Sequence, residues 1–197
     1  LLSDREVIRK SQMVTLRLGK YLDKLKAIIK SNASNPKDDK YQSKLHGLAW
    51  VATYVESLKQ MSLWADRLLK NGSFGKTERI ILNLSFNEYI NQIFGGIIMS
   101  QGEIIRPVDL DYRKLALDKL NCEEVLYFKD EVDADHLRSE LIDLIIQNEG
   151  TSFIGNDGLN EDQKMIRQEF HRFSKEKIEP FAHGWHIKDE LIPLNVI

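Results

Sequence analysis

Two histidines three residues apart, His183 and His186, and the nearby Asp189 are residue types that bind transition metals. On one continuous helix, residues three apart share a face, so this pair could ligate one ion. Gly184 between the histidines and Pro180 before them disfavour a continuous helix, and no glutamate stands between them as in a zinc-protease helix. We therefore expect connector histidines packed beside a tryptophan, and no metal-binding residue.

Cys122 is the single cysteine of the chain and the candidate nucleophile. A nucleophilic thiolate needs a positively charged, partly exposed setting that lowers the thiol pKa, and the neighbouring Glu123 and Glu124 act in the opposite direction. We therefore expect a buried or inert thiol. A single cysteine also excludes an intramolecular disulfide and a multi-cysteine zinc site. The carboxylates Glu123 and Glu124, like Asp38 and Asp39, are adjacent in sequence and do not face each other on a helix, which makes them poor acid–base pairs.

The segment Gly95–Gly102 holds three glycines and one serine, a composition that invites comparison with phosphate-binding loops. It does not follow the G-x-G-x-x-G pattern, and the residues before it predict a helix where such a loop needs a strand. We expect a tight turn between helices, with Arg106 as the residue there to test for an anion contact. From the residues alone we assign no catalytic, cofactor-binding or metal-binding residue.

The composition is that of a globular protein, with 42% hydrophobic and 29% charged residues in a chain of 197. No apolar run approaches the about 20 residues of a membrane helix, and the net charge of -2 gives no basic footprint for nucleic acid. Residues 1–70 carry 14 basic and 7 acidic side chains, whereas residues 131–159 carry 1 and 7. We expect the basic first third to be a solvated helix surface or a complement to the acidic segment, an anionic partner being the alternative.

The elements that must position these side chains are helices. Only 4 Pro and 11 Gly occur, gathered in a few places, which favours long helices and an all-α fold. Ser3 followed by Glu6 predicts a capping box at the first helix. Residues 107–119 are read as a short helix or irregular, and 124–128 as a short helix or a strand. Helices are expected at 3–29, at 37–70, from 76 to Gly95, and from 133 to 150.

The second expected helix carries two apolar stripes, which together form an arc wider than one neighbouring helix can cover. We therefore expect it to be central in a bundle and to contact several elements. The arc around Trp50, Tyr54 and Met61 has an alternative role as a groove for a partner protein. Burial of these three side chains would favour a bundle core, and a contiguous exposed patch would favour a docking module.

The signals change after residue 152. Residues 153–159 contain two glycines and two Asx residues and read as a linker. Asn160 is then expected to cap a helix with Gln163, and Ile166, Phe170 and Phe173 to form its buried stripe. This helix is expected to end before Pro180, and a further one to begin after Pro193 and to stop after about one turn. We expect three parts, residues 1–152, 153–159 and 160–197. Because the chain begins with Leu1 and stops within that turn, we expect it to be a trimmed piece of a longer protein.

Residues 158–197 resemble the opening of the flavin-dependent acyl-CoA dehydrogenases, which begin with an acidic-capped helix, an exit of the type KIEPFA, a tryptophan-containing connector and a proline before the next helix. The stretches LHGLAWVATYVESLKQMSLWADRL and GGIIMSQGEIIRP are similar to a helical extension carried by one branch, the methylsuccinyl-CoA dehydrogenases. The residues that carry the first resemblance are Met165, Ile166, Arg167, Phe170, Phe173, Ile178, Pro180, Trp185 and Pro193.

The resemblance implies an FAD enzyme in which a glutamate removes the α-proton of an acyl-CoA thioester and the β-hydrogen leaves as hydride to the flavin. For this branch, (2S)-methylsuccinyl-CoA would be oxidised to mesaconyl-CoA in the ethylmalonyl-CoA pathway. The base and most FAD contacts of the family lie in later domains, so no such residue is carried over and this chain alone is expected to be inactive. The resemblance also implies a cytoplasmic homo-oligomer that passes electrons to an electron-transferring flavoprotein. The alternative is a non-catalytic helical module for interaction or oligomerisation.

Overall fold

A computed structural model describes residues 2–31, 39–110, 120–147 and 156–197 of the chain. They form two compact units, Leu1–Asn156, here called the bundle unit, and Asp157–Ile197, called the C-terminal unit. The regular secondary structure of the described residues is helical apart from one small hairpin, which confirms the all-α prediction. None of the helices in these ranges combines the length and the apolar character needed to cross a membrane.

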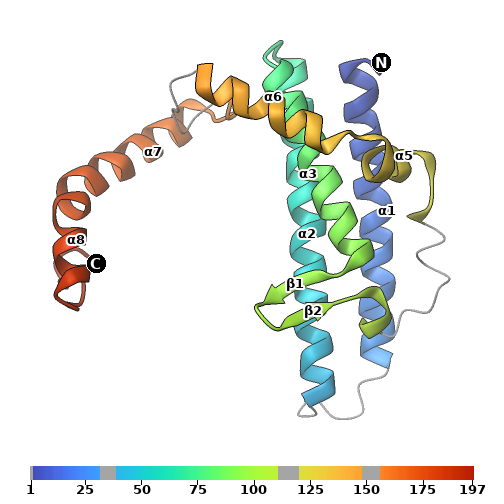
Figure 1. Ribbon diagram of the computed structural model, residues 1–197, viewed down its shortest axis with the longest axis horizontal. Helices are drawn as coiled ribbons and strands as arrows, with labels where there is room; N and C mark the ends of the chain where they lie inside the picture. The colour runs from blue at the N-terminus through green and yellow to red at the C-terminus, as the bar shows by residue number, and fades with distance from the viewer. Residues whose placement is uncertain (1, 32–38, 111–119, 148–155) are drawn as a thin grey trace. The chain divides into compact units, whose positions relative to one another are not determined.

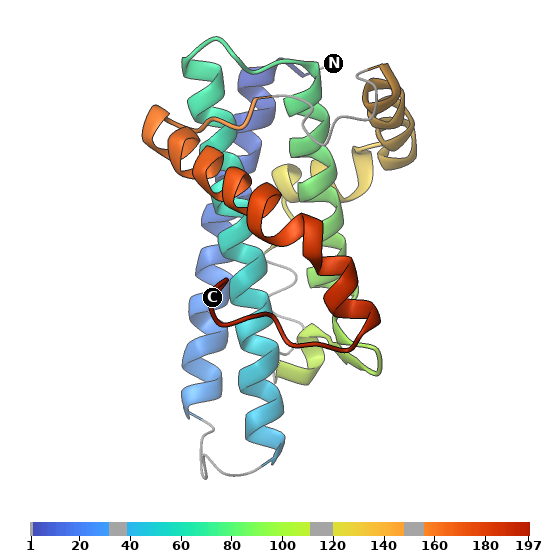
Figure 2. The ribbon, with the colours of Figure 1, turned by 90° about the vertical axis from the view of Figure 1, so that its left-hand side faces the viewer.

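Three long helices build the bundle unit and run side by side (Figures 1 and 2). They are α1 (Asp4–Ser31), α2 (Asp39–Lys70) and α3 (Lys76–Gly95), within one or two residues of the predicted starts. α2 packs against α1, α3 and the segment after α3, which confirms its predicted central place. Shorter elements follow: β1 (Ile97–Ser100), β2 (Glu103–Ile105), the 3-10 turn η1 (Pro107–Leu110), α5 (Glu123–Leu126), the π-helical turn η2 (Tyr127–Glu131) and α6 (Ala134–Gln147).

Local signals in the sequence explain where these helices begin and end. The backbone N–H of Ser3 donates to Glu6 Oε2 at 2.7 Å, and Ser3 Oγ accepts from the Glu6 N–H at 3.4 Å, which is the predicted capping box. Gly72 takes a positive φ of 69° after α2, and the next N–H returns to the Leu68 carbonyl at 2.8 Å. The apolar stripe of α1, including Leu18 and Leu25, is fully buried.

The core joins the long helices to the segment after residue 120. Phe86 of α3 and Phe128 of η2 are both fully buried, with ring centroids 4.7 Å apart. The region 124–128, left open between helix and strand by the sequence, is therefore helical and closes the core against α3. Of the segment 107–119, the structure describes 107–110, which form η1, and 111–119 lie outside the described residues.

The prediction of a tight turn between helices at Gly95–Gly102 is wrong, because this segment begins an antiparallel hairpin. β1 pairs with β2 in the register Ile97↔Ile105 and Ile98↔Ile104. Period-two alternation places Ile97 and Ile105 on the face that packs on the bundle, where both are buried. The run of β-branched residues on either side of the glycine-containing turn favours strands, and the glycines masked this signal.

The C-terminal unit contains α7 (Glu161–Phe173), the π-helical turn η3 (Ser174–Ile178) and α8 (Glu179–Ile187). Asn160 caps α7 as predicted, since its Oδ1 accepts the Gln163 N–H at 2.9 Å. The predicted end before Pro180 is wrong: Pro180 lies in the first turn of α8, where a missing N–H costs no helical hydrogen bond. After Pro193 the chain makes a turn, closed by the Val196 N–H on the Pro193 carbonyl at 2.9 Å.

The stripe predicted to be buried on α7 is exposed within this unit. Ile166, Phe170 and Phe173 expose 58%, 72% and 41% of their surface. The residues follow the expected helical spacing, but the C-terminal unit supplies no element that covers them. Of the predicted linker 153–159, residues 153–155 lie outside the described ranges and 156–159 have no regular secondary structure, and the expected helix end at 150 also lies outside those ranges.

Candidate functional site

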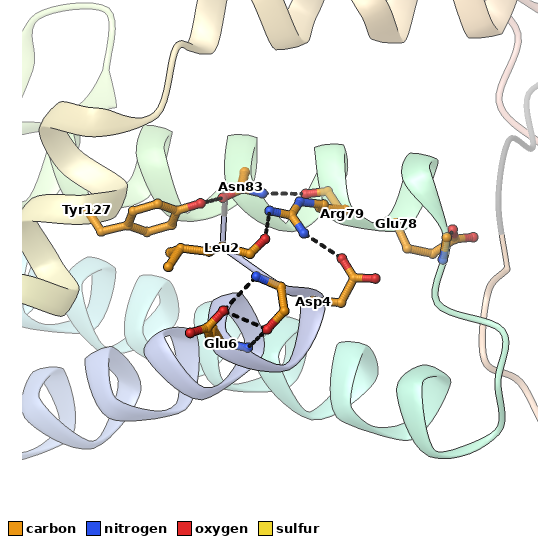
Figure 3. Close-up of polar contacts among 9 residues, drawn as sticks. Leu2, Asp4, Glu6, Glu78, Arg79, Asn83 and Tyr127 are labelled. Atoms are coloured by element: carbon orange, nitrogen blue, oxygen red, sulfur yellow. Dashed lines mark hydrogen bonds and ion pairs between the residues drawn. The ribbon is translucent and has the colours of Figure 1, made fainter.

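Arg79 joins the beginnings of α1 and α3 at one end of the bundle unit (Figure 3). Its Nη1 donates to Asp4 Oδ1 at 2.6 Å and its Nη2 donates to the Leu2 carbonyl at 2.7 Å. Hydrogen bonds to charged groups contribute about 1.5–3 kcal/mol each when they are partly buried. Both terminal nitrogens of the guanidinium therefore hold α1 against α3.

Arg79 begins a row of polar side chains along α3 at four-residue steps, which places them on one face. Asn83 Nδ2 donates to the Arg79 carbonyl at 2.9 Å, and Asn91 Nδ2 donates to the Asn87 carbonyl at 2.9 Å. Asn87 Nδ2 also reaches the carbonyl of Phe128 in η2 at 2.8 Å. The row therefore satisfies the backbone of a π-helical turn, which leaves carbonyls without their usual helical partners.

Tyr127 lies over this row, and its hydroxyl donates to Asn83 Oδ1 at 3.3 Å (Figure 3). Burial raises the pKa of Tyr127 above its usual value, with Arg79 acting in the opposite direction. The phenol therefore stays protonated at neutral pH and acts as a donor. It does not have the lowered pKa that a tyrosine general base needs.

A pocket of about 570 Å³ opens beside these residues, between the starts of α1 and α6. Hydrogen bonds from Ser3 hold the pKa of Glu6 below its usual value, so the pocket contains a carboxylate at neutral pH. Asp133 caps α6 by accepting the His136 N–H at 3.0 Å. The polar residues that line the pocket include Glu6, Arg79, Asn83, Tyr127, Asp133 and His136.

Glu78 is a buried carboxylate, 5% exposed, at the start of α3. Its Oε2 accepts the Gly75 N–H at 2.9 Å, and its Oε1 accepts the Asn156 N–H at 2.6 Å. Trp64 Nε1 donates to the Asn156 carbonyl at 3.1 Å. The backbone N–H and carbonyl of Asn156 are thus both bound to the bundle, and Glu78 acts as an anchor for the end of the bundle unit.

The predicted chemical candidates near residue 122 do not form a reactive group. Cys122 is half-buried, and burial is the main cause that raises the pKa of its thiol, in line with the expected inert cysteine. Glu123 pairs with Lys10, whereas Glu124 Oε2 lies 3.6 Å from Arg17 Nη2. The two carboxylates therefore face different cations. Of the other adjacent pair, residue 38 lies outside the described residues.

The two histidines lie on a continuous helix, contrary to the prediction of a broken one. α8 runs through Gly184 and contains both His183 and His186, while Asp189 follows the helix with a positive φ of 54°. Within residues 2–31, 39–110, 120–147 and 156–197, no group of three or more His, Cys, Asp or Glu side chains is arranged to hold a metal ion.

The arc on α2 belongs largely to the bundle. Trp50, Tyr54 and Met61 are half-buried and pack on the core. Tyr54 stacks on Tyr89 of α3 at 4.2 Å between centroids, and its hydroxyl donates to Gln92 Oε1 at 2.6 Å. By the criterion set from the sequence, this burial favours a core over an exposed docking groove.

Arg106, the residue singled out for an anion contact, follows β2. Its backbone N–H donates to Asp109 Oδ2 at 2.8 Å. A carboxylate at this position makes the surroundings less favourable for an anion. The structure therefore gives no support for a phosphate-binding loop at the hairpin.

Comparison with known proteins identifies a relative for this chain. It is 43% identical over 152 residues to a (2S)-methylsuccinyl-CoA dehydrogenase of Cereibacter sphaeroides, a match that covers 77% of this chain and 27% of the relative. No protein-family model matches the chain. The C-terminal unit holds only residues 157–197, which are 41 residues, so at least 111 of the 152 matched residues belong to the bundle unit. The similarity thus extends well beyond the last fifth of the chain, and the resemblance to the acyl-CoA dehydrogenases is confirmed.

Proposed function

Because this chain is related to an acyl-CoA dehydrogenase over three-quarters of its length, we propose that the protein oxidises an acyl-CoA thioester and that (2S)-methylsuccinyl-CoA is the substrate, with mesaconyl-CoA as product. The observation that carries the proposal is the extent of the match, which includes most of the bundle unit. The chain spans about a quarter of the length of the relative, so the activity is proposed for the whole protein.

FAD is the cofactor that this reaction class implies, and the polar pocket of the bundle unit does not fit it. The polar pocket of the bundle unit is lined by the carboxylates Glu6, Glu131 and Asp133, whose charge disfavours a pyrophosphate. Arg79 in the same pocket is already paired with Asp4. We therefore place the flavin contacts, the glutamate base and the contact with an electron-transferring flavoprotein in the part of the enzyme outside this chain.

The exposed stripe of α7 supports the same division of roles. Ile166, Phe170 and Phe173 carry the family-like pattern and remain uncovered within their own unit. An apolar stripe of this kind normally packs against further helices of the same domain. We propose that residues 160–197 are the first helices of the catalytic helical domain, that 1–152 form an accessory helical domain, and that 153–159 link them.

The experiment is a comparison of the full-length protein with the 197-residue chain. The full-length protein is expected to copurify with bound flavin and to reduce an artificial electron acceptor in the presence of (2S)-methylsuccinyl-CoA. The 197-residue chain is expected to show neither flavin absorbance nor turnover. A full-length, flavin-loaded protein that oxidises other acyl-CoA esters but not this one would overturn the substrate, and a flavin-free full-length protein would overturn the enzyme class.

A cytoplasmic location and a homo-oligomeric state complete the proposal and rest on the family resemblance. Fractionation of cells and sedimentation of the full-length protein test them directly. The rival function, a non-catalytic interaction module, loses support from the burial of Trp50, Tyr54 and Met61.

A further inference from the structure

The hairpin β1–β2 carries an isoleucine pair on each face, and the bundle covers only one of the two pairs. Ile97 and Ile105 are buried against the bundle. Ile98 and Ile104 are directly paired in the register and therefore share the opposite face, where they expose 62% and 44% of their surface. Paired isoleucines on both faces are typical of a strand pair covered on both sides, since a solvated face normally carries polar residues.

The hairpin is a fixed feature and not a loose loop. Gly47 of α2 provides the notch that receives Ile105, because a Cβ at Gly47 would lie 2.4 Å from Ile105 Cγ1. Gly96 enters the hairpin with a positive φ of 134°, and a Cβ there would lie 2.7 Å from Ile104 Cγ2. The hairpin lies across α2 in Figure 1. The two outer isoleucines are therefore held in place before any partner arrives, which lowers the entropic cost of covering them.

We infer that the outer face of this hairpin, Ile98 and Ile104, is covered by a segment of the same polypeptide that follows residue 197. This inference rests on the proposed function, because that proposal makes the chain part of a longer protein; the contact itself requires only the longer chain. The relative offers the material for such a contact, since 73% of its length lies outside the matched region. Val108 in η1, which is 72% exposed, would extend the covered surface.

The size of the patch argues for an intramolecular occupant over a second copy. A stable interface between separate proteins buries about 800 Å² on each partner, contributed by some 20–30 residues. Three exposed aliphatic side chains fall far short of that. A tethered segment needs much less area, because the linker raises its effective concentration and the segment has already lost most of its translational freedom.

The test uses the full-length protein with Cys122→Ser and one new cysteine, either Ile104→Cys in the patch or Leu16→Cys as control. Leu16 is an isolated exposed residue of α1, 53% exposed. We expect a maleimide to label position 104 about tenfold more slowly than position 16, since labelling then requires local opening of the contact. Equal rates at the two positions would overturn the inference.

A second measurement identifies the occupant. A benzophenone attached to the Val108→Cys variant, at the rim of the patch, is activated by light, and the products are separated on a denaturing gel and sequenced by mass spectrometry. Crosslinks that migrate as one chain and join the hairpin to residues beyond 197 support the inference. Crosslinks that migrate as two chains would assign the patch to a second copy and overturn it.

The proposed function is assayed separately on the unmodified full-length protein. If that protein oxidises the acyl-CoA substrate while position 104 labels as fast as position 16, only the hairpin inference fails. If position 104 is protected but no acyl-CoA is oxidised, only the proposed function fails.

Discussion

The packing of the hairpin on Gly47 of α2 allows a prediction with a matched control in the same chain. At Gly47 an added Cβ would lie 2.4 Å from Cγ1 and 2.7 Å from Cδ1 of Ile105. The change Gly47→Ala must therefore displace β2 or force the buried Ile105 side chain out of its rotamer. Overpacking of this kind typically costs about 1–3 kcal/mol.

Gly19→Ala is the control, because Gly19 also lies inside a long helix and nothing approaches within 4 Å of its added Cβ. Alanine is favoured over glycine inside a helix by about 0.8–1.0 kcal/mol, so this variant should be more stable than the parent chain. Gly47→Ala gains the same helix propensity, but the overpacking lowers its stability. We expect its free energy of unfolding to lie about 1–3 kcal/mol below that of Gly19→Ala.

Urea unfolding followed by far-ultraviolet circular dichroism measures both variants. Ile105→Ala is then added to each background. Alone it should cost about 2–5 kcal/mol, as for other buried isoleucines, and it should cost less beside Gly47→Ala because the clash is removed with the side chain. Equal stabilisation by the two glycine substitutions, with an unchanged cost of Ile105→Ala, would refute the seating of the hairpin on α2.

Three further predictions concern polar contacts of the bundle unit. Asn87→Ala leaves the Phe128 carbonyl without its donor and should lower the free energy of unfolding by about 1–3 kcal/mol in the same urea assay; an unchanged value would show that this bond does not hold η2. Glu78→Gln can accept through only one oxygen, so one of its two contacts, with the Gly75 N–H or with the Asn156 N–H, should loosen. Trp64 binds the carbonyl of Asn156, so its fluorescence should shift to the red when that contact loosens. Because burial raises its pKa, Cys122 should react with iodoacetamide more slowly than a small free thiol at pH 7, with a reactivity midpoint above the ordinary value of about 8.5, and a midpoint below it would contradict the burial argument.

Helices of both units could be predicted where a signal acts locally. Ser3 and Glu6 form the first cap, and Asn160 with Gln163 forms another, as their spacing required. The double stripe on the second helix likewise indicated a central position, since no single neighbour can cover so wide an arc. These features depend on residues within one or two turns of each other.

Two errors had different causes, one a contact with a neighbour far along the chain and the other a local π-helical turn. The hairpin after Gly96 is stabilised by Ile105 at the notch of Gly47, a contact between residues that no local spacing connects. Pro180 was expected to end a helix, and a π-helical turn before it instead lets the chain continue as α8. Proline restricts the residues before it in an α-helix, and the wider π turn relieves this restriction.

The candidate site was missed for a related reason. Arg79, Asn83, Asn87 and Asn91 recur at four-residue steps, and this spacing alone was a usable signal of one polar face. The partners of Asn87 and Asn91 include backbone carbonyls of η2, however, and a π-helical turn has no clear sequence pattern by which those partners could be foreseen. The spacing could have predicted a polar row along one face of α3 but not its role.

The state of the buried polar groups fits the proposal that the bundle unit supports chemistry that takes place elsewhere. A catalytic carboxylate needs an oxygen that is free to take up a proton or to contact the substrate. Both oxygens of Glu78 instead accept hydrogen bonds from backbone N–H groups. Within the described ranges, the buried side-chain atoms without a hydrogen bond are Arg17 Nε and Glu124 Oε2, which belong to one ion pair. A hydrogen bond from Cys122, with the nearby Arg17 charge as a smaller cause, holds the pKa of Glu124 below its usual value, so this carboxylate is a poor base near neutral pH. Such an arrangement keeps a fold rigid, which is what an accessory domain must supply if it is to hold the hairpin and the exit at Asn156 in fixed positions for the rest of an enzyme.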